Sequence, residues 1–197
     1  MNFRRIVKVS ICLAMLSVST GLWAQNESRW QNVDINQQNR EPRRASFFAY
    51  ESQDKAQGFD KKESANYLSM EGMWKFNFVK DHNKRPAKFF AVNYDDSKWK
   101  DFPVPGLFEL NGYGDATYKN VGYAWATQFA PNPPYISETN NYTGSYRRTF
   151  DLPTDWKGKD VYFHVGSATS NLTLWVNGKY VGYSEDSRLP AHFDISK

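Results

Sequence analysis

The segment that decides the fold reads LTLWVNGKYVGY, residues 172–183. Apolar and polar side chains alternate on both sides of Asn177-Gly178, which is the period of two expected of strands with one buried face. Asn-Gly accepts the positive φ angles that a two-residue type I′ turn needs. The segment therefore predicts two antiparallel strands joined as a β-hairpin.

Alternation of the same kind recurs on the N-terminal side of the hairpin. It predicts strands at three further segments, residues 72–79, 145–152 and 160–166. Between them, residues 101–106 contain Pro103 and Pro105, which we expect to interrupt any ladder, and residues 107–142 are expected to form long irregular loops. No stretch of convincing length has a helical period, so the sequence predicts an all-β fold, an antiparallel β-sandwich of the jelly-roll or galactose-binding-like kind.

Aromatic residues are unusually frequent, since 7 Trp, 12 Tyr and 14 Phe make up 17% of the chain. Flat rings pack well on the pleated faces of a sheet, and they also stack on the C–H faces of sugars. The sheet core is the first interpretation, and sugar stacking is kept as the second.

The N-terminus has the pattern of an export signal. Arg4, Arg5 and Lys8 precede a short apolar run at residues 9–18, and Ala24 is the natural cleavage site. We therefore predict a signal peptide at residues 1–24 and export to the periplasm or the medium. The apolar run is far shorter than the roughly 20 residues that cross a bilayer, so we expect no membrane span.

Removal of this signal changes the charge and the cysteine count. It takes away three of the 25 basic residues and none of the 21 acidic ones, so the formal charge falls from +4 to +1 and nucleic acid is not expected as a partner. Cys12 is also removed, which excludes a disulfide and a Cys-based metal site. The three histidines are far apart in the sequence, without the spacing of metal ligands, and are expected to be ordinary surface or sheet residues.

Residues 25–66 are expected to form an extended N-terminal arm and loop ahead of the sandwich, which we place at residues 67–197. Residues 25–44 are polar and bury too little apolar surface to be ordered alone. The aromatic cluster at residues 47–50 could attach the arm to a larger body, and residues 53–66 are expected to form a loop or a short helix.

Five ordered motifs carry a resemblance to a known family. They read LSMEGMWKF at residues 68–76, VPGLFELNGY at 104–113, YKNVGY at 118–123, TGSYRR at 143–148, and WVNG at 175–178 followed by GYSEDSRLP at 182–190. From about residue 39 to residue 197 the chain resembles the N-terminal sugar-binding domain of glycoside hydrolase family 2, most closely that of the β-galactosidases.

The resemblance implies hydrolysis of terminal β-D-galactosyl residues with retention, and it implies roles for three residues. Asn120 matches an asparagine that contacts galactose hydroxyls, Val121 lines the wall beside it, and Asp186 matches an aspartate that binds the C6 hydroxyl and helps to hold a sodium ion. In the complete enzyme it also implies a divalent cation such as Mg²⁺. Without the resemblance, Asn120 would be a loop residue that bonds its own backbone and Asp186 a solvated turn carboxylate.

No catalytic residue is assigned to this chain. Retaining glycosidases need two carboxylates about 5–5.5 Å apart, and in this family the resemblance puts both glutamates in a downstream (β/α)₈ barrel. It also predicts further sandwich strands after Lys197, so we expect a truncated chain that is inactive alone. The expected partners are the β-galactoside, the downstream domains and a second copy of the complete enzyme. A stand-alone carbohydrate-binding module without catalysis is the alternative, and an assembly domain is a third interpretation.

Overall fold

The computed structural model describes residues 29–116, 118 and 135–196, and the predictions for residues 1–24, Asn120 and Val121 fall outside this part of the chain. Its strands are β1 (Gln37–Gln38), β2 (Gly72–Val79), β3 (Lys100–Val104), β4 (Thr143–Arg147), β5 (Tyr162–Val165), β6 (Leu172–Val176), β7 (Lys179–Ser184) and β8 (Ala191–Asp194). The helices are short: α1 (Gln53–Gly58) and the 3₁₀ turns η1 (Arg29–Gln31), η2 (Lys61–Glu63), η3 (His82–Lys84), η4 (Glu109–Asn111) and η5 (Thr154–Trp156). All strand pairs are antiparallel, so the predicted all-β class is confirmed.

The predicted hairpin is formed by β6 and β7. Asn177 and Gly178 have φ angles of 51° and 78°, the positive values of a type I′ turn, and they connect the paired residues Val176 and Lys179. A register shift follows between Leu174 and Trp175. On the outer edge of β7 lies the short strand β1, so the hairpin sheet has the order β1-β7-β6.

A second sheet has the order β3-β2-β4 and corrects the prediction for the proline segment. Pro103 does not interrupt the ladder, because it lies within β3 and faces Met73 of β2. The expectation was wrong because β3 is an edge strand, where a residue without an N–H group is tolerated. The prediction for residues 145–152 was too long, since β4 ends at Arg147 and Leu152 is 44% exposed.

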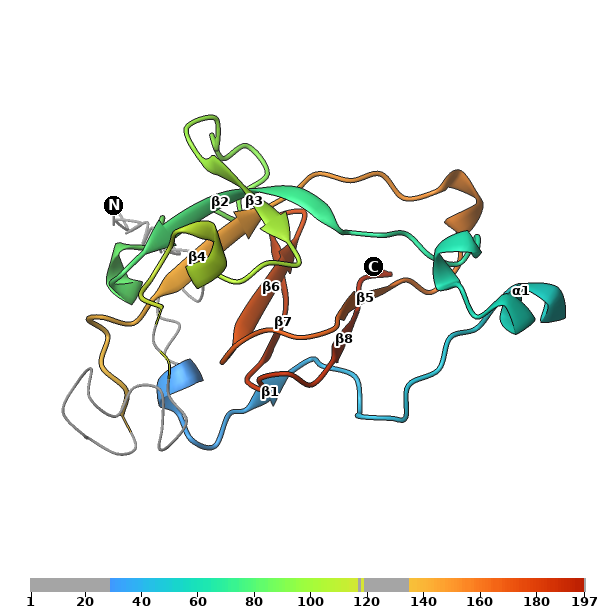
Figure 1. Cartoon of the computed structure of the whole chain (residues 1–197), viewed down its shortest axis with the longest axis horizontal. Coiled ribbons are helices and arrows are strands. Elements are labelled where there is room, and N and C mark those ends of the chain that lie inside the picture. Colours follow the sequence, from blue (N-terminus) through green and yellow to red (C-terminus); the bar gives the residue numbers. More distant parts are fainter. Residues whose placement is uncertain (1–28, 117, 119–134, 197) are drawn as a thin grey trace, which may run out of the picture.

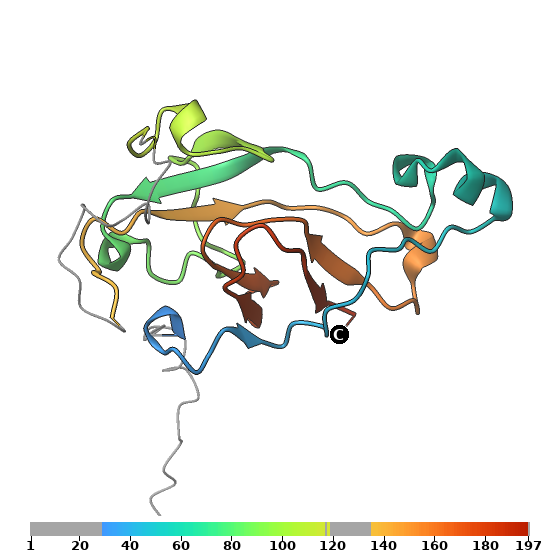
Figure 2. The ribbon, with the colours of Figure 1, turned by 60° about the horizontal axis from the view of Figure 1, so that its bottom comes forward.

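The two sheets form layers, with β2 and β4 above the strands near the C-terminus and the N-terminal segment below them (Figures 1 and 2). Aromatic contacts join the layers: the ring of Phe90, in the loop after β2, is stacked on that of Trp175 in β6 at a centroid distance of 5.3 Å. Among the described residues, the largest fully buried side chains are all aromatic, namely Phe76, Phe102, Tyr183 and Phe193. For these rings the sheet-core interpretation is confirmed.

The third sheet pairs β5 with β8, and it packs closely against the hairpin at Gly182 of β7. A Cβ added to Gly182 of β7 would lie 2.5 Å from the ring of Phe193 in β8. Phe193 is 0% exposed, so β7 needs glycine at this position for β8 to reach the core.

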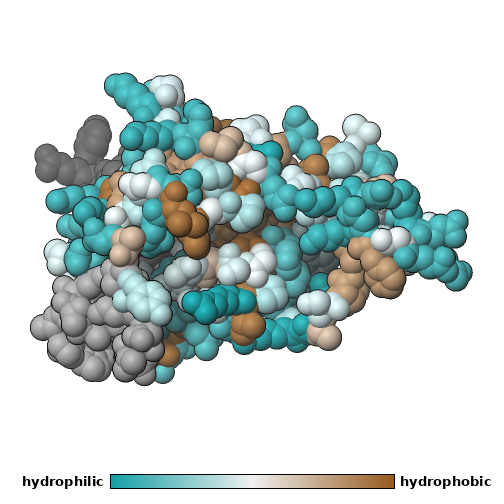
Figure 3. Space-filling view, viewed as in Figure 1, coloured by the Kyte–Doolittle hydropathy of each residue, from teal (hydrophilic) through white to brown (hydrophobic). Residues whose placement is uncertain are grey.

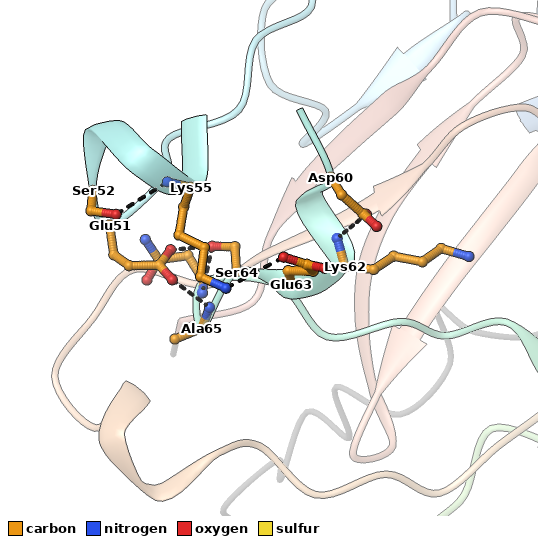
Figure 4. A network of polar contacts seen from close by, with 9 residues as sticks. Glu51, Ser52, Lys55, Asp60, Lys62, Glu63, Ser64 and Ala65 are labelled. Atoms are coloured by element: carbon orange, nitrogen blue, oxygen red, sulfur yellow. Dashed lines mark hydrogen bonds and ion pairs between the residues drawn. The ribbon is translucent and has the colours of Figure 1, made fainter. Parts of the chain in front are cut away.

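Residues 51–66, which include α1, lie at one end of the molecule (Figure 1), and Figure 4 shows the polar contacts among them. The hydroxyl of Ser52 caps α1 by accepting a hydrogen bond from the N–H of Lys55. The carboxylate of Asp60 caps η2 in the same way by accepting from the N–H of Lys62. The Glu51 carboxylate accepts hydrogen bonds from the Ser64 hydroxyl and the Ala65 N–H, and these bonds lower its pKa. The segment therefore contains the short helix that was one of the two predicted alternatives.

The face of the molecule seen in Figure 3 carries both polar and apolar residues. Figure 3 shows apolar residues scattered over this face among polar ones, without one continuous apolar area. Within the part of the chain that the structure describes, no helix has the length and hydropathy needed to cross a membrane.

Candidate functional site

The candidate site lies where β7 ends and the chain turns away from the hairpin. Tyr183 and Ser184, the last residues of β7, are 2% and 3% exposed. The Tyr183 hydroxyl donates a 2.6 Å hydrogen bond to Glu185, so this carboxylate is directed back along its own strand. Asp186 is the next residue, and 32% of its side chain is exposed.

The turn that carries Asp186 is fixed by hydrogen bonds along its backbone. The carbonyl of Asp186 accepts from the N–H of Leu189 at 3.3 Å. The hydroxyl of Ser187 accepts from the N–H of Ser170, two residues before β6 begins, at 2.8 Å. These bonds connect the turn that carries Asp186 to the segment that precedes the hairpin.

The N-terminal segment, residues 36–43, runs along the same end of β7 (Figure 1). Within β1, Gln37 is paired with Ser184 and Gln38 with Tyr183. The carbonyl of Asn36 accepts from the N–H of Glu185 at 3.0 Å, one residue before Asp186. Within the predicted arm, Gln37 and Gln38 therefore form a short third strand of the hairpin sheet.

Two arginines of this segment contact the Asp186 carboxylate. Arg43 forms an ion pair with Oδ2, and Nη1 of Arg40 lies 3.9 Å from the same oxygen. Nη1 of Arg40 also donates to the hydroxyl of Ser184 at 3.0 Å. The Arg40 side chain is 8% exposed, and its burial, together with the charge of Arg43, lowers its pKa. Asp186 therefore offsets the repulsion between two neighbouring cations.

Of the three predicted site residues, the structure describes only Asp186. Asn120 and Val121 lie outside the described residues, so their roles remain predictions. Sequence reasoning missed Arg40 and Arg43, which were part of a segment expected to be an arm. The cluster of basic residues at positions 40–44 was visible in the sequence, but nothing in it indicated which carboxylate it would contact.

Two of the three histidines meet across the third sheet. His164 of β5 and His192 of β8 are opposite each other in the sheet, with Nδ1 and Nε2 2.8 Å apart, and burial lowers the pKa of both. His82 packs edge-on against Trp30, and burial lowers its pKa to about 4. In the described part of the chain, no three His, Cys, Asp or Glu side chains are grouped in a way that could hold a metal ion.

Comparison with known proteins gives one family match. Residues 67–197 match the model for "Glycosyl hydrolases family 2, sugar binding domain". The chain is 36% identical over 174 residues to a β-galactosidase of Priestia megaterium, which covers 88% of this chain and 17% of that protein. It is 35% identical over 140 residues to a β-galactosidase large subunit of Leuconostoc lactis, covering 65% of this chain and 22% of that protein.

Among solved structures, a β-glucuronidase of an uncultured Clostridium species matches at 23% identity and a TM-score of 0.44, covering 66% of this chain and 19% of that protein. The curated relatives are far longer than the chain, which spans about a sixth of the length of the Priestia protein. The family match extends from the residues before β2 to the end of the chain, and it includes the hairpin and Asp186. The chain therefore belongs to glycosyl hydrolases family 2, through the sugar-binding domain of that family.

Proposed function

We propose that this chain is the N-terminal sugar-binding domain of an exported β-galactosidase, which hydrolyses terminal β-D-galactosyl residues with retention. The observation that carries the proposal is the combined match: residues 67–197 fit the sugar-binding domain, and the named relatives with 35–36% identity are β-galactosidases. The chain spans 17% of the Priestia protein, so in this proposal the remaining machinery would come from segments outside this chain.

In this proposal the chain contributes to galactose binding and the chemistry occurs elsewhere. A retaining reaction needs an acid/base carboxylate and a nucleophile about 5–5.5 Å apart. Glu138 accepts a hydrogen bond from Asn83, and Glu185 accepts one from Tyr183, so both carboxylates have local structural partners. We assign the two catalytic glutamates to the barrel that the family resemblance implies, and we expect the 197-residue chain alone to be inactive.

Asp186 is the described residue that we assign to the sugar. A carboxylate accepts hydrogen bonds from hydroxyl groups, and the Asp186 side chain is partly open to solvent at the end of β7. Asn120 and Val121 would complete the same subsite. In the natural polypeptide, Asp186→Asn should raise KM for a nitrophenyl β-D-galactoside by about 10- to 100-fold, the loss expected when a charge-assisted hydrogen bond is weakened.

The described residues around Asp186 do not fit the sodium ion that the resemblance implies. A hard cation such as sodium is held by several oxygen ligands. The described surroundings of Asp186 supply one carboxylate and the two guanidinium groups of Arg40 and Arg43, an arrangement that does not fit a bound cation. A divalent cation such as Mg²⁺, and assembly of the complete enzyme with a second copy, stay proposals for regions outside this chain.

The mass of the natural polypeptide in its source cells tests the proposal directly. If 174 residues are 17% of the relative, a protein of that size has about 1,000 residues and a mass of about 110–120 kDa. An antibody against residues 135–196 should therefore detect an exported species of that size that hydrolyses the nitrophenyl galactoside. A stable, inactive species of about 20 kDa would instead support the stand-alone carbohydrate-binding module.

A further inference from the structure

The arginines at Asp186 are presented by a backbone that is held on two sides. The side-chain amide of Asn39 donates to the carbonyl of Val181 in β7 at 2.9 Å. The N–H of Glu41 donates to the carbonyl of His192 in β8 at 2.9 Å. The segment between these two anchors contains Arg40, and Arg43 follows two residues after Glu41. Tertiary contacts therefore position the two guanidinium groups at Asp186.

The two arginines differ in what they do. Arg40 is buried and is also bonded to Ser184, so it is part of the packing of the segment against β7. Arg43 is 49% exposed and has its ion pair with Oδ2 of Asp186. Of the two, Arg43 is the cation that solvent can reach, and it lies directly beside the Asp186 carboxylate.

Charge balance decides whether a sodium ion could bind there as well. One carboxylate with two guanidinium groups already carries a net charge of +1. The neighbouring Glu185 carboxylate accepts a hydrogen bond from Tyr183 and is directed along β7. A sodium ion would add a third positive charge beside two arginines, which is unfavourable at these separations.

We propose that Arg43 is the counter-cation of Asp186, an internal guanidinium group in place of a sodium ion. The inference rests on the proposed galactose subsite for its functional meaning. Its consequence is that the position of a sugar-binding carboxylate depends on the N-terminal segment and is independent of Na⁺. Arg43 is thus a positioning residue that acts on the substrate through Asp186.

The test compares Na⁺ with K⁺ at equal ionic strength, using thermal unfolding of the full 197-residue chain and ²³Na NMR line widths. The wild-type chain should show the same Tm in both salts and no broadening of the ²³Na line. Arg43→Gln should gain a sodium response, with a Tm about 3–5 °C higher in Na⁺ when its concentration is ten times the Kd. Arg43→Lys, which keeps a cation, should behave like the wild type.

Arg44→Gln is the matched control, because it removes the same charge from the adjacent position. Arg44 lies over the ring of Phe47 at 4.4 Å. This variant should stay insensitive to the choice of cation. A sodium response of the wild-type chain, or no response of Arg43→Gln, would overturn the inference.

Binding of D-galactose, measured in the same two salts, separates this inference from the proposed function. If galactose binds neither the chain nor the natural polypeptide, the galactose subsite is wrong. The unfolding and NMR comparison still decides the role of Arg43 in that case, because neither measurement requires a sugar.

Discussion

The side-chain oxygen of Gln38 accepts a hydrogen bond from the hydroxyl of Tyr180 at 2.8 Å, across a sequence separation of 142 residues. The guanidinium group of Arg29 donates to the same oxygen at 2.6 Å and lies over the Tyr180 ring. A residue of β1 thus connects the start of the described chain to the hairpin. The N-terminal segment is therefore structurally part of the sheet that carries Asp186.

Removal of this hydrogen bond should weaken the attachment of β1. Tyr180→Phe keeps the ring and deletes the donor, so we expect the free energy of unfolding to fall by about 1 kcal/mol. Urea-induced unfolding of the two chains measures this difference in the free energy of unfolding. Tyr162→Phe is the control, because that side chain is 46% exposed and should change stability by less than about 0.5 kcal/mol. Equal effects of the two variants would contradict the role of Tyr180.

The contact between β7 and β8 predicts a strong effect at one glycine. Gly182→Ala places a methyl group against the buried ring of Phe193, and we expect a loss of about 1–3 kcal/mol from overpacking. Gly58→Ala is the matched control, since a Cβ at Gly58 meets nothing within 4 Å. It should be neutral or slightly stabilising. Unfolding in urea compares the two, and a neutral Gly182→Ala would show that β8 does not pack as described.

Arg147 should hold the loop after β2 against β4. Its Nε donates to Asp96 at 2.7 Å, and its Nη1 donates to the carbonyls of Phe89 and Ala91. Arg147→Lys cannot reproduce this set of planar contacts, so we expect a loss of about 1.5–3 kcal/mol.

The near-ultraviolet circular dichroism of the chain should also change in this variant, because the stacking of Phe90 on Trp175 depends on the same loop. Arg188→Lys, at an exposed turn position, serves as the control. An unaltered spectrum together with unaltered stability would contradict the assignment.

Because His82 is buried, we expect the free energy of unfolding to fall in acid. Burial lowers its pKa from 6.5 to about 4, so the folded chain keeps the ring neutral while the unfolded chain takes up a proton. Its contribution is complete above pH 6.5 and is lost as the pH falls towards 4. After allowance for partial solvent exposure, we expect it to be worth about 1–2 kcal/mol.

An NMR titration of the His82 ring checks this directly, with His82→Gln used to assign the signal. The midpoint should lie near pH 4, and the variant should lose less stability than the wild type between pH 6.5 and 4. His192→Gln, which alters a different ring, should leave the His82 midpoint unchanged. A midpoint above 6 would contradict the burial of His82 against Trp30.

Sequence by itself determined the features whose cause is local. The Asn177-Gly178 turn and the alternation in β2 follow from backbone preference and side-chain period, and both appear where they were expected. The ordered family motifs were also sufficient to indicate the family, which the match over residues 67–197 shows. These features need no knowledge of what lies on the other side of the sheet.

Only the tertiary structure decided which distant residues meet. Pro103 is tolerated in the ladder because β3 is an edge strand. The order of strands in a sheet cannot be predicted from the local alternation of residues. Arg43 contacts Asp186 because β1 pairs with β7, which brings opposite ends of the chain together. The sequence contained the charges and the apolar rings, but the pairing of long-range contacts depends on the packing of the whole core.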